Sequence, residues 1–453
     1  MKLILTVLSI GFEMVSSATA KNNTWWVTDE ELEFVRKRVT HVDFIPGTPE
    51  ENAVRFYTDE ARTKYVEFNF DESKAGEGTY TLEDPLTFID GRKVRSRADW
   101  SERRKEILSL FEREVYGRMP PKPDAMVPEL ISEKLTEDRF ALERRYRMWF
   151  RKDKTGPAID WIVFIPRYAA KPCPVILHLN YHGNDLIASG RTNHYVLPLG
   201  EFTARGYAFM SARYTQISGD GAKRGGFFNG VCELWGRRDP DKTDNPGSLM
   251  IWAWGLCRGL DLAETISGID AKRNVVVGSS RLGKAALLAA AYDERFAVCV
   301  PNQTGAVGVQ LMKRTFGETL AGQRLMLPHW YCKGVWKYTD DPKSQPFDQH
   351  LLLACVAPRA LLLECYHKLW FDPTGEFLSA KAASPVWEFL TGKGLGLEQM
   401  PPEYSDCAVK PPFGYVRRTE MHGLSPYDWK WALDFADRVF AGESSSKGQT
   451  LRK

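Results

Sequence analysis

The segment VVVGSSRLGKAALLAAAYDERF, from Val275 to Phe296, decides how the centre of this chain folds. It begins with a continuous apolar run, is interrupted by Gly-Ser-Ser-Arg, and continues with alanines and leucines at helical spacing. This pattern is typical of a buried strand that turns directly into a buried helix. Polar side chains at such a turn must be hydrogen-bonded or used in chemistry, so the two serines and the arginine are candidate functional residues.

Strand-like and helix-like segments alternate on both sides of this stretch. Apolar runs predict strands at residues 160–166, 174–181, 206–214, 273–278, 296–302, 359–366 and 414–422. Helices are expected between several of them, including 250–266, and after the last one, at 427–441. Continuous apolar strands joined by helices predict an α/β fold, a three-layer sandwich with a mostly parallel sheet covered on both faces. Sites in such sheets form beyond the carboxyl ends of the strands.

Ser280 occupies the strand-to-helix turn, where an α/β-hydrolase carries its nucleophile. That elbow is usually G-x-S-x-G, because small residues permit a tight turn and the next backbone N–H faces a developing oxyanion. Here the second glycine comes one place later, in Gly278-Ser279-Ser280-Arg281-Leu282-Gly283. The alternative is a simple helix cap, since serine is a favoured N-cap residue.

A serine nucleophile needs a histidine base, and in this fold the chain order is serine, acid, histidine. The sequence TEMHGLSPYDW places His422 after the last predicted strand and before the last predicted helix. His178 lies inside a predicted strand, and His41, His182 and His194 precede the serine. His422 is therefore the predicted base, although a lone histidine can also be structural.

Further motifs follow one another along most of the chain. They are NYHGN at 180–184, IWAWGLCRGLD at 251–261, RTFGET at 314–319, LPHWYCKGVWKY at 327–338, FDQHLLLACVAPRALL at 347–362 and WFDPTGEFLSA at 370–380. Together with GSSRLGKAALLAAAYDERF, they resemble the bacterial branch of the glucuronoyl esterases, from about Tyr80 to Phe440. The resemblance implies an α/β-hydrolase that cleaves carboxyl esters of uronic acids in plant cell-wall polysaccharide.

The same resemblance implies catalytic roles for three residues. Ser280 matches the family's nucleophile, His422 its base, and Arg281 the arginine that helps to stabilise the oxyanion. A cation beside the nucleophile would favour the tetrahedral oxyanion, so the chemistry agrees with this assignment.

Substrate-binding roles are implied for three more. Lys284, Glu318 and Trp370 match positions that hold the hydroxyls and ring of the uronate. They supply a donor, an acceptor and a flat apolar face, as a sugar requires. The alternatives are solvated helix positions for Lys284 and Glu318 and a place in the core for Trp370.

The catalytic acid is where this chain departs from the family pattern. One family position, in the loop after the strand at 296–302, often holds glutamate and is Gln303 here; another often holds aspartate and is Lys368 here. Neither can stabilise an imidazolium on His422. The acid has moved to Asp372, or Gln303 orients the histidine as a neutral acceptor, or the protein is a non-catalytic descendant that binds uronate polysaccharide.

The leaving alcohol stays open between an aromatic ester, as in lignin linkages, and a methyl ester, as in pectin. An acetyl esterase is disfavoured because Lys284, Glu318 and Trp370 would recognise a sugar in the acid half of the ester. We therefore expect a carboxylic ester hydrolase, either a glucuronoyl esterase or a pectin-type methylesterase.

Composition excludes several other classes of protein. The chain has 453 residues, with 61 basic and 58 acidic side chains and a net charge of +3, and we expect no nucleic-acid partner. The eight cysteines include no C-x-x-C pair, and the eight histidines include no zinc-like pair, so we expect neither a metal nor a cofactor. Buried free thiols and disulfides remain equal alternatives.

Residues 1–20 are predicted to be a secretory signal peptide, with a lysine, an apolar run and a small-residue end. Residues 21–127 are expected to form an N-terminal wrapping segment, with a helix from Asp99 to Gly117 capped by Asp99. Residues 128–441 are the predicted catalytic domain and 442–453 a polar tail. We expect an exported monomer, periplasmic or extracellular, without a membrane span, whose partner is a uronic-acid-containing polysaccharide or oligosaccharide.

Overall fold

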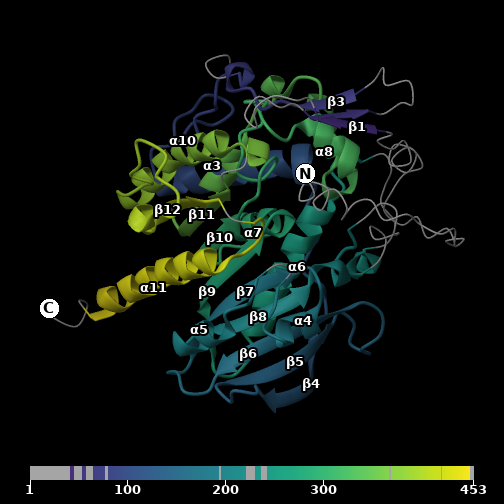
Figure 1. The fold of residues 1–453 in the computed structure, drawn as a ribbon, viewed down its shortest axis with the longest axis vertical. Coiled ribbons are helices and arrows are strands. Elements are labelled where there is room, and N and C mark those ends of the chain that lie inside the picture. Colours follow the sequence, from purple (N-terminus) through teal and green to yellow (C-terminus); the bar gives the residue numbers. More distant parts are fainter. Residues whose placement is uncertain are drawn as a thin grey trace, which may run out of the picture.

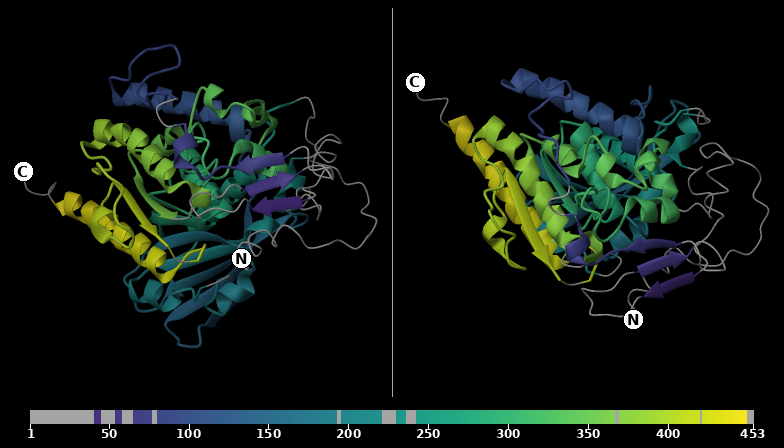
Figure 2. Two further views of the ribbon diagram at one scale, coloured as in Figure 1. Left: turned by 45° about the horizontal axis from the view of Figure 1, so that its top comes forward. Right: turned by 90° about the horizontal axis from the view of Figure 1, so that it is seen from above.

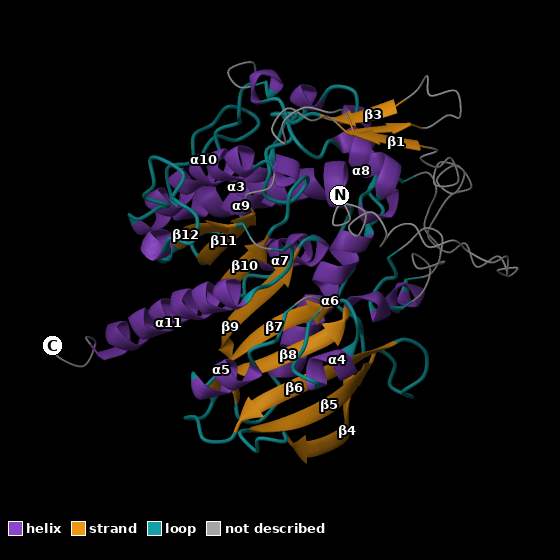
Figure 3. Cartoon of the chain, in the orientation of Figure 1, coloured by secondary structure: helices purple, strands orange, loops and turns teal. Residues whose placement is uncertain are grey.

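A nine-stranded sheet forms the centre of the protein. The computed structural model describes residues 41–44, 54–57, 65–76, 80–192, 195–220, 230–235, 242–366, 369–419 and 421–448. The strand order is β12-β11-β10-β9-β7-β8-β6-β5-β4, with helices on both sides (Figures 1 and 3). The predicted three-layer α/β fold is confirmed. The predicted signal peptide lies outside the described residues.

One half of the sheet is parallel and corresponds to predicted strands. Its members are β7 Cys173–Asn180, β8 Ala208–Arg213, β9 Ile269–Ser279, β10 Val298–Asn302, β11 Ala360–Tyr366 and β12 Phe413–Arg418. Side chains of β9 alternate between two cores, since Val276 belongs to one and Val275 and Val277 to the other. Because helices cover both faces, these strands are apolar at successive positions.

The other half is antiparallel and was only partly predicted. β6 Ala158–Pro166 pairs with β8 and with β5 Ala141–Trp149, which pairs with the edge strand β4 Val127–Leu135. β6 has the apolar sequence of a central strand. β5 reads ALERRYRMW, and β4 is exposed at most positions. Their charged side chains face solvent or each other, so an apolar run could not identify them.

Two sets of helices cover the sheet. On one face lie α3 Arg97–Phe111, α6 Ser248–Ala263, α7 Arg281–Tyr292, α9 Gln349–Ala354 and α10 Pro373–Thr391. The opposite face is covered by α4 Asn184–Ala188, α5 Leu199–Ala204 and α11 Pro426–Gly448. Figure 2 shows α3 and α11 on opposite sides of the sheet. α11 continues to Gly448, so the predicted polar tail begins inside this helix.

The predicted boundaries of two elements were wrong. α3 begins at Arg97 because Ser96 is its cap: the Asp99 N–H donates to Ser96 Oγ (3.1 Å), and the Ser96 N–H donates to Asp99 Oδ2 (3.0 Å). Asp99 is thus the third residue of a capping box rather than the cap. The last strand ends at Arg418 instead of His422, which leaves His422 in the connection between β12 and α11.

A small antiparallel sheet precedes the main one. It consists of β1 His41–Phe44, β2 Val54–Tyr57 and β3 Tyr65–Phe68. The Phe68 ring packs edge-on against Trp370, with centroids 4.9 Å apart. A Cβ on Gly322 of α8 (Leu320–Met326) would lie 2.1 Å from the same ring. The N-terminal region therefore packs beside a predicted substrate-binding residue.

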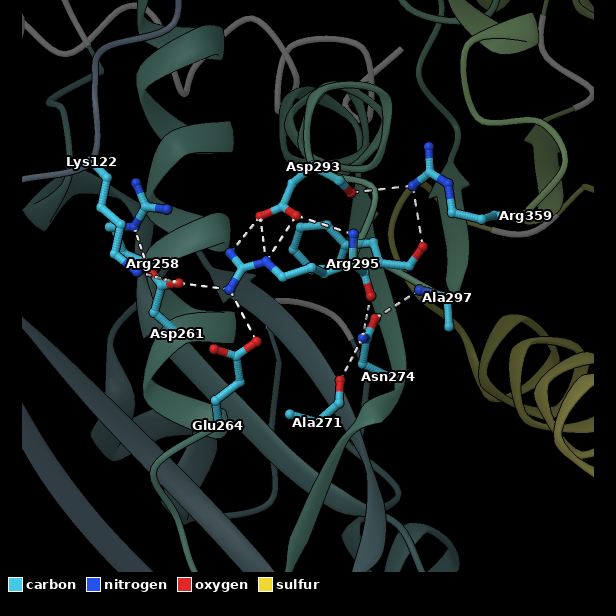
Figure 4. Close-up of polar contacts among 11 residues, drawn as sticks. Lys122, Arg258, Asp261, Glu264, Ala271, Asn274, Asp293, Arg295, Ala297 and Arg359 are labelled. Carbon is cyan, nitrogen blue, oxygen red and sulfur yellow. Dashed lines mark hydrogen bonds and ion pairs between the residues drawn. The ribbon is translucent and has the colours of Figure 1, made fainter. Parts of the chain in front are cut away.

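The carboxyl end of α7 is enclosed by a charge network (Figure 4). Arg295 pairs with Asp293 (2.6 Å), Asp261 (2.7 Å) and Glu264 (3.1 Å), and Asp261 also pairs with Arg258 (2.6 Å). This end of the helix lies away from the carboxyl ends of the parallel strands, so the network is structural.

All eight cysteines are free, and all but Cys407 are buried. The free-thiol alternative therefore holds in this structure. Within the described ranges, no helix is long and apolar enough to span a membrane, and no cluster of His, Cys, Asp or Glu has the makeup of a metal site.

Candidate active site

Ser280 forms a strained elbow between β9 and α7. Its backbone has φ 59° and ψ −128°, and its N–H donates to the backbone oxygen of Asn302 (2.9 Å). A Cβ on Gly278 would lie 2.1 Å from the Leu282 oxygen, and one on Gly283 would lie 2.8 Å from the Asn302 oxygen. Both glycines are therefore required by close backbone contacts, and the later second glycine serves the same turn.

The helix-cap alternative does not describe the Ser280 side chain. Ser280 is the N-cap residue of α7 by position, yet its side chain makes no capping hydrogen bond. A left-handed non-glycine residue costs about 1–3 kcal/mol and persists where the surroundings hold it in place. The elbow thus presents a hydroxyl that the helix does not use.

His422 is held by Gln303. Its Nδ1 lies 2.6 Å from Gln303 Oε1, and the same oxygen accepts the N–H of Gly423 (3.0 Å). A backbone N–H can only donate, so the shared amide atom must be the oxygen and Nδ1 must carry its proton. In this tautomer Nε2 carries the lone pair, as a base requires.

Gln303 is itself firmly placed. It is 1% exposed, has φ 48°, and donates its N–H to the backbone oxygen of Glu364 (2.7 Å). Burial raises the pKa of the Glu364 carboxyl well above its usual range, and its Oε2 accepts a hydrogen bond from Asn302 (3.0 Å). Burial therefore favours the neutral form of Glu364, whose backbone oxygen holds Gln303 in place.

Asp372 is engaged elsewhere. Its carboxylate accepts hydrogen bonds from Arg314 Nε (3.0 Å) and from the N–H of Gly375 (2.9 Å), which caps α10. Arg314 also pairs with Glu72. Burial raises the pKa of Asp372 to about 6, although Arg314 opposes the shift. The structure gives Asp372 a capping role and places Gln303, not Asp372, at His422 Nδ1. Lys368 lies outside the described residues.

Arg281 is oriented by a buried aspartate that the sequence did not reveal. Asp220 pairs with Arg281 and accepts hydrogen bonds from Tyr214 (2.8 Å), His329 (2.8 Å) and Trp330 (2.9 Å). Although burial opposes ionisation, the Arg281 charge and these donors hold the pKa of Asp220 far below its usual range. Arg281 Nε has no partner among the described residues.

Trp330 also connects Arg281 to Lys284. The Arg281 guanidinium lies 4.8 Å from the Trp330 ring centre and the Lys284 ammonium 5.2 Å from it. Lys284 is 3% exposed, and burial lowers its pKa to about 8, although Glu318 opposes the shift. The solvated-helix alternative for Lys284 is therefore wrong.

Glu318 and Trp370 form a hydrogen-bonded pair. Trp370 Nε1 donates to Glu318 Oε1 (2.7 Å), while Oε2 accepts the N–H of Ala306 (3.3 Å). Burial raises the pKa of Glu318, and Lys284 opposes this shift. Trp370 is half-buried between the N-terminal sheet and Glu318, so it is neither a core residue nor a free surface one.

An aromatic ring also faces the histidine. Phe371 stacks on His422 with centroids 5.0 Å apart and planes inclined by 27°. Asp220 lies in none of the motifs found in the sequence, and Phe371 lies in the motif at 370–380 without an assigned role. The only available signal for Phe371 was its position directly after Trp370.

The sheet order, with an elbow serine after β9 and a histidine after β12, is that of an α/β-hydrolase. The family model described as "Glucuronyl esterase, fungi" matches residues 162–391. The chain is 33% identical over 408 residues to a carbohydrate esterase from an unknown prokaryotic organism, covering 83% of this chain and 93% of that protein. The chain belongs to the glucuronoyl esterase family and is a carboxylic ester hydrolase.

Two further similarities agree with this assignment. A solved glucuronoyl esterase from Solibacter usitatus is 32% identical, with a TM-score of 0.73, over 80% of this chain and 98% of that one. A 4-O-methyl-glucuronoyl methylesterase from Podospora anserina is 28% identical over 323 residues, covering 68% of this chain and 60% of that protein.

Proposed function

We propose that this protein hydrolyses the carboxyl ester of a uronic acid, with Ser280 as nucleophile and His422 as base. The observation that carries the proposal is the Ser280 elbow, where backbone strain and two close glycine contacts hold a hydroxyl at the carboxyl end of β9. A protein that only bound polysaccharide would have no need of a strained serine, a matched histidine and an adjacent arginine.

In the proposed reaction, Ser280, His422 and Arg281 act in two steps. His422 Nε2 accepts the Ser280 proton as Oγ attacks the ester carbonyl, and the resulting oxyanion is stabilised by Arg281. The alcohol leaves with the proton from His422, which gives an acyl-enzyme. Water, deprotonated by the same histidine, then releases the uronic acid and restores Ser280.

Gln303 supports this cycle as a neutral orienting residue. By accepting from Nδ1 it fixes the ring and the tautomer, which is part of what an acid does in a triad. It brings no negative charge to the imidazolium. We therefore propose a Ser-His-Gln arrangement in which the alternative acid, Asp372, stabilises the fold around α10.

Recognition of the acid half is proposed for Lys284, Glu318 and Trp370. The buried ammonium and the carboxylate can donate to and accept from sugar hydroxyls, and the indole offers its ring face. Since these groups lie on the acyl side, the leaving alcohol is less constrained. A methyl ester is the favoured substrate, supported by the named activity of the methylesterase from Podospora anserina.

A panel of esters tests the proposal. Purified protein is incubated with glucuronate methyl ester, glucuronate benzyl ester, methylated pectin and acetylated xylan, and released alcohol or acetate is measured. We expect alcohol from the glucuronate esters, none from Ser280→Ala, and normal activity from the control Arg295→Ala, which lies beyond the carboxyl end of α7. Release of acetate alone would contradict the assignment of the sugar to the acyl side.

Export is proposed from the sequence of residues 1–20, and a monomer is proposed as the functional form. N-terminal sequencing of the secreted protein and light scattering of the mature chain test these two points.

A further inference from the structure

A cavity of about 370 Å³ opens beside the candidate active site, along the same edge of the sheet. Its lining includes Arg145 and Tyr146 of β5, Arg147, His182 and Arg213. The cavity carries three guanidinium groups, unlike the apolar interior on either side of the sheet.

Strand register places this cavity close to the nucleophile. His178 pairs with Val277, which puts Asn180 level with Ser279 two residues later, and Asn180 itself pairs with Arg213. Neighbouring strands are about 4.8 Å apart, so Arg213 lies roughly 10 Å across the sheet from the elbow.

Two tyrosines separate the cavity from the active site. Tyr181 precedes His182 and donates to the backbone oxygen of Ser279 (2.8 Å), while Tyr214 follows Arg213 and donates to Asp220 (2.8 Å). Their rings meet edge-on, with centroids 5.3 Å apart. His182 and Arg213 are thus direct chain neighbours of tyrosines that contact Ser279, next to Ser280, and Asp220, which pairs with Arg281.

The charges in the cavity do not cancel. Arg147 makes two hydrogen bonds to Asp160 (2.6 and 2.9 Å), and Arg145 pairs with Asp185 (2.6 Å). Arg213 is exposed, and no ion pair or hydrogen bond of its side chain is found among the described residues. Its side chain passes over Gly183, where a Cβ would lie 3.8 Å from Arg213 Cδ.

We propose that this cavity is a subsite for the free carboxylate of a second uronic acid on the same polysaccharide, bound by Arg213. Guanidinium groups bind carboxylates through paired N–H donors. This inference rests on the proposed function, because it extends the recognition of the polymer beyond the esterified residue.

The first test compares two oligosaccharide methyl esters that differ only in the neighbouring sugar, which is either a free uronic acid or its neutral counterpart. The measured quantity is the ratio of kcat/KM for the acidic over the neutral substrate. We expect Arg213→Gln to lower this ratio about five-fold, as for loss of one exposed ion pair, and added salt to lower it in the wild type.

Arg151→Gln, which removes an exposed arginine outside the cavity, is the matched control. An unchanged ratio in Arg213→Gln, or an equal fall in Arg151→Gln, overturns the proposal.

The second test separates the subsite from the esterase activity. An unesterified acidic oligouronate is titrated calorimetrically into Ser280→Ala, with and without Arg213→Gln. We expect binding about five-fold weaker in the double variant. If the wild type hydrolyses no uronate ester but this difference persists, the proposed function fails and the subsite stands. If hydrolysis is found but the two variants bind alike, the subsite fails alone.

Discussion

Helix α7 has a network of polar groups at each end, and the two networks differ in how completely their atoms are bonded. At the carboxyl end, Arg295 binds three carboxylates, and Arg359 donates to the backbone oxygens of Asp293 and Phe296 (Figure 4). At the amino end, Ser279 Oγ, Arg281 Nε and Gln303 Nε2 are buried without a partner among the described residues.

This difference separates a structural network from a functional one. A buried polar atom without a partner costs about 1–3 kcal/mol, so the amino end is the less stable arrangement. The cost is acceptable where a substrate supplies the missing partner. Removing a residue from the carboxyl end should therefore affect stability, whereas removing one from the amino end should affect catalysis.

The largest effect is expected for Ser280→Ala. Loss of the nucleophile should reduce kcat by a factor on the order of 10³ or more, while the Tm stays close to that of the wild type. Activity on glucuronate methyl ester and a thermal melt of the same sample measure both quantities. Activity within a few-fold of the wild type would mean that Ser280 is not the nucleophile.

Arg281→Ala and Arg295→Ala form the direct test of the comparison. Arg281→Ala should lower kcat about 10²-fold, as for loss of an oxyanion donor. Arg295→Ala should leave kcat unchanged and lower the free energy of unfolding by roughly 1–2 kcal/mol. Steady-state kinetics and urea unfolding give kcat and the free energy of unfolding for each of the two variants. A higher KM with an unchanged kcat in Arg281→Ala would show that the arginine binds the ground state instead.

The sequence predicted the parallel half of the sheet because its strands are buried on both faces and therefore apolar throughout. It also predicted where Ser280 and His422 lie, at the turn after β9 and between β12 and α11, since the fold dictates both positions. β4 and β5 were missed because their exposed faces carry charges. The predicted start of α3 was wrong because aspartate is a common N-cap residue, but Asp99 is the third residue of this helix and Ser96 is its N-cap.

The contacts around the catalytic residues could not be predicted in the same way. Asp220 is 61 residues before Arg281 in the chain, and only the folded structure brings its carboxylate to Arg281 and to the Trp330 indole N–H. The sequence left Gln303 and Asp372 as alternatives for the group that orients His422, because both follow strands of the parallel sheet. Only the folded chain shows their different contacts: Gln303 lies at His422 Nδ1, whereas Asp372 caps α10 and pairs with Arg314.

Gln303 and Asp372 can be compared by mutation. Gln303→Ala should lower kcat roughly 10- to 100-fold, because His422 loses its orientation and tautomer. Asp372→Asn should lower stability through the weakened Arg314 contact but leave kcat within a few-fold. Gln303→Glu should raise kcat and move the acid limb of the pH profile to higher pH, because a carboxylate favours the imidazolium. A loss of orders of magnitude in Asp372→Asn, with full activity in Gln303→Ala, would assign the acid to Asp372.

Asp220→Asn is expected to have a smaller effect than loss of Arg281 itself. The amide keeps the shape of Asp220 but not its charge, so Arg281 should be less well oriented and kcat should fall roughly ten-fold. KM should change little, because Asp220 is buried behind Arg281 and has no access to substrate. Tyr214→Phe is the control, since it removes another partner of Asp220 without touching Arg281. An equal loss of kcat in both variants would indicate a general packing defect.

The smallest predicted effect is a pH dependence caused by Lys284. Burial lowers the pKa of this ammonium group to about 8, so its positive charge is fully present below that pH and is lost as the pH rises through it. The ammonium donates more strongly to a sugar hydroxyl than the neutral amine does, and we expect kcat/KM to fall about three-fold on the alkaline side. Profiles from about pH 6 to about pH 10, corrected for spontaneous ester hydrolysis, should show this limb in the wild type and not in Lys284→Met.

If Lys284→Met keeps the limb, another group titrates there. If the wild-type profile is flat, Lys284 remains charged and the amino end of α7 holds a full cation beside Arg281 throughout the range. In the expected case, the amino end of α7 loses the Lys284 charge under mildly alkaline conditions. The carboxyl end keeps the Arg295 charge, because the carboxylate partners of Arg295 raise its pKa.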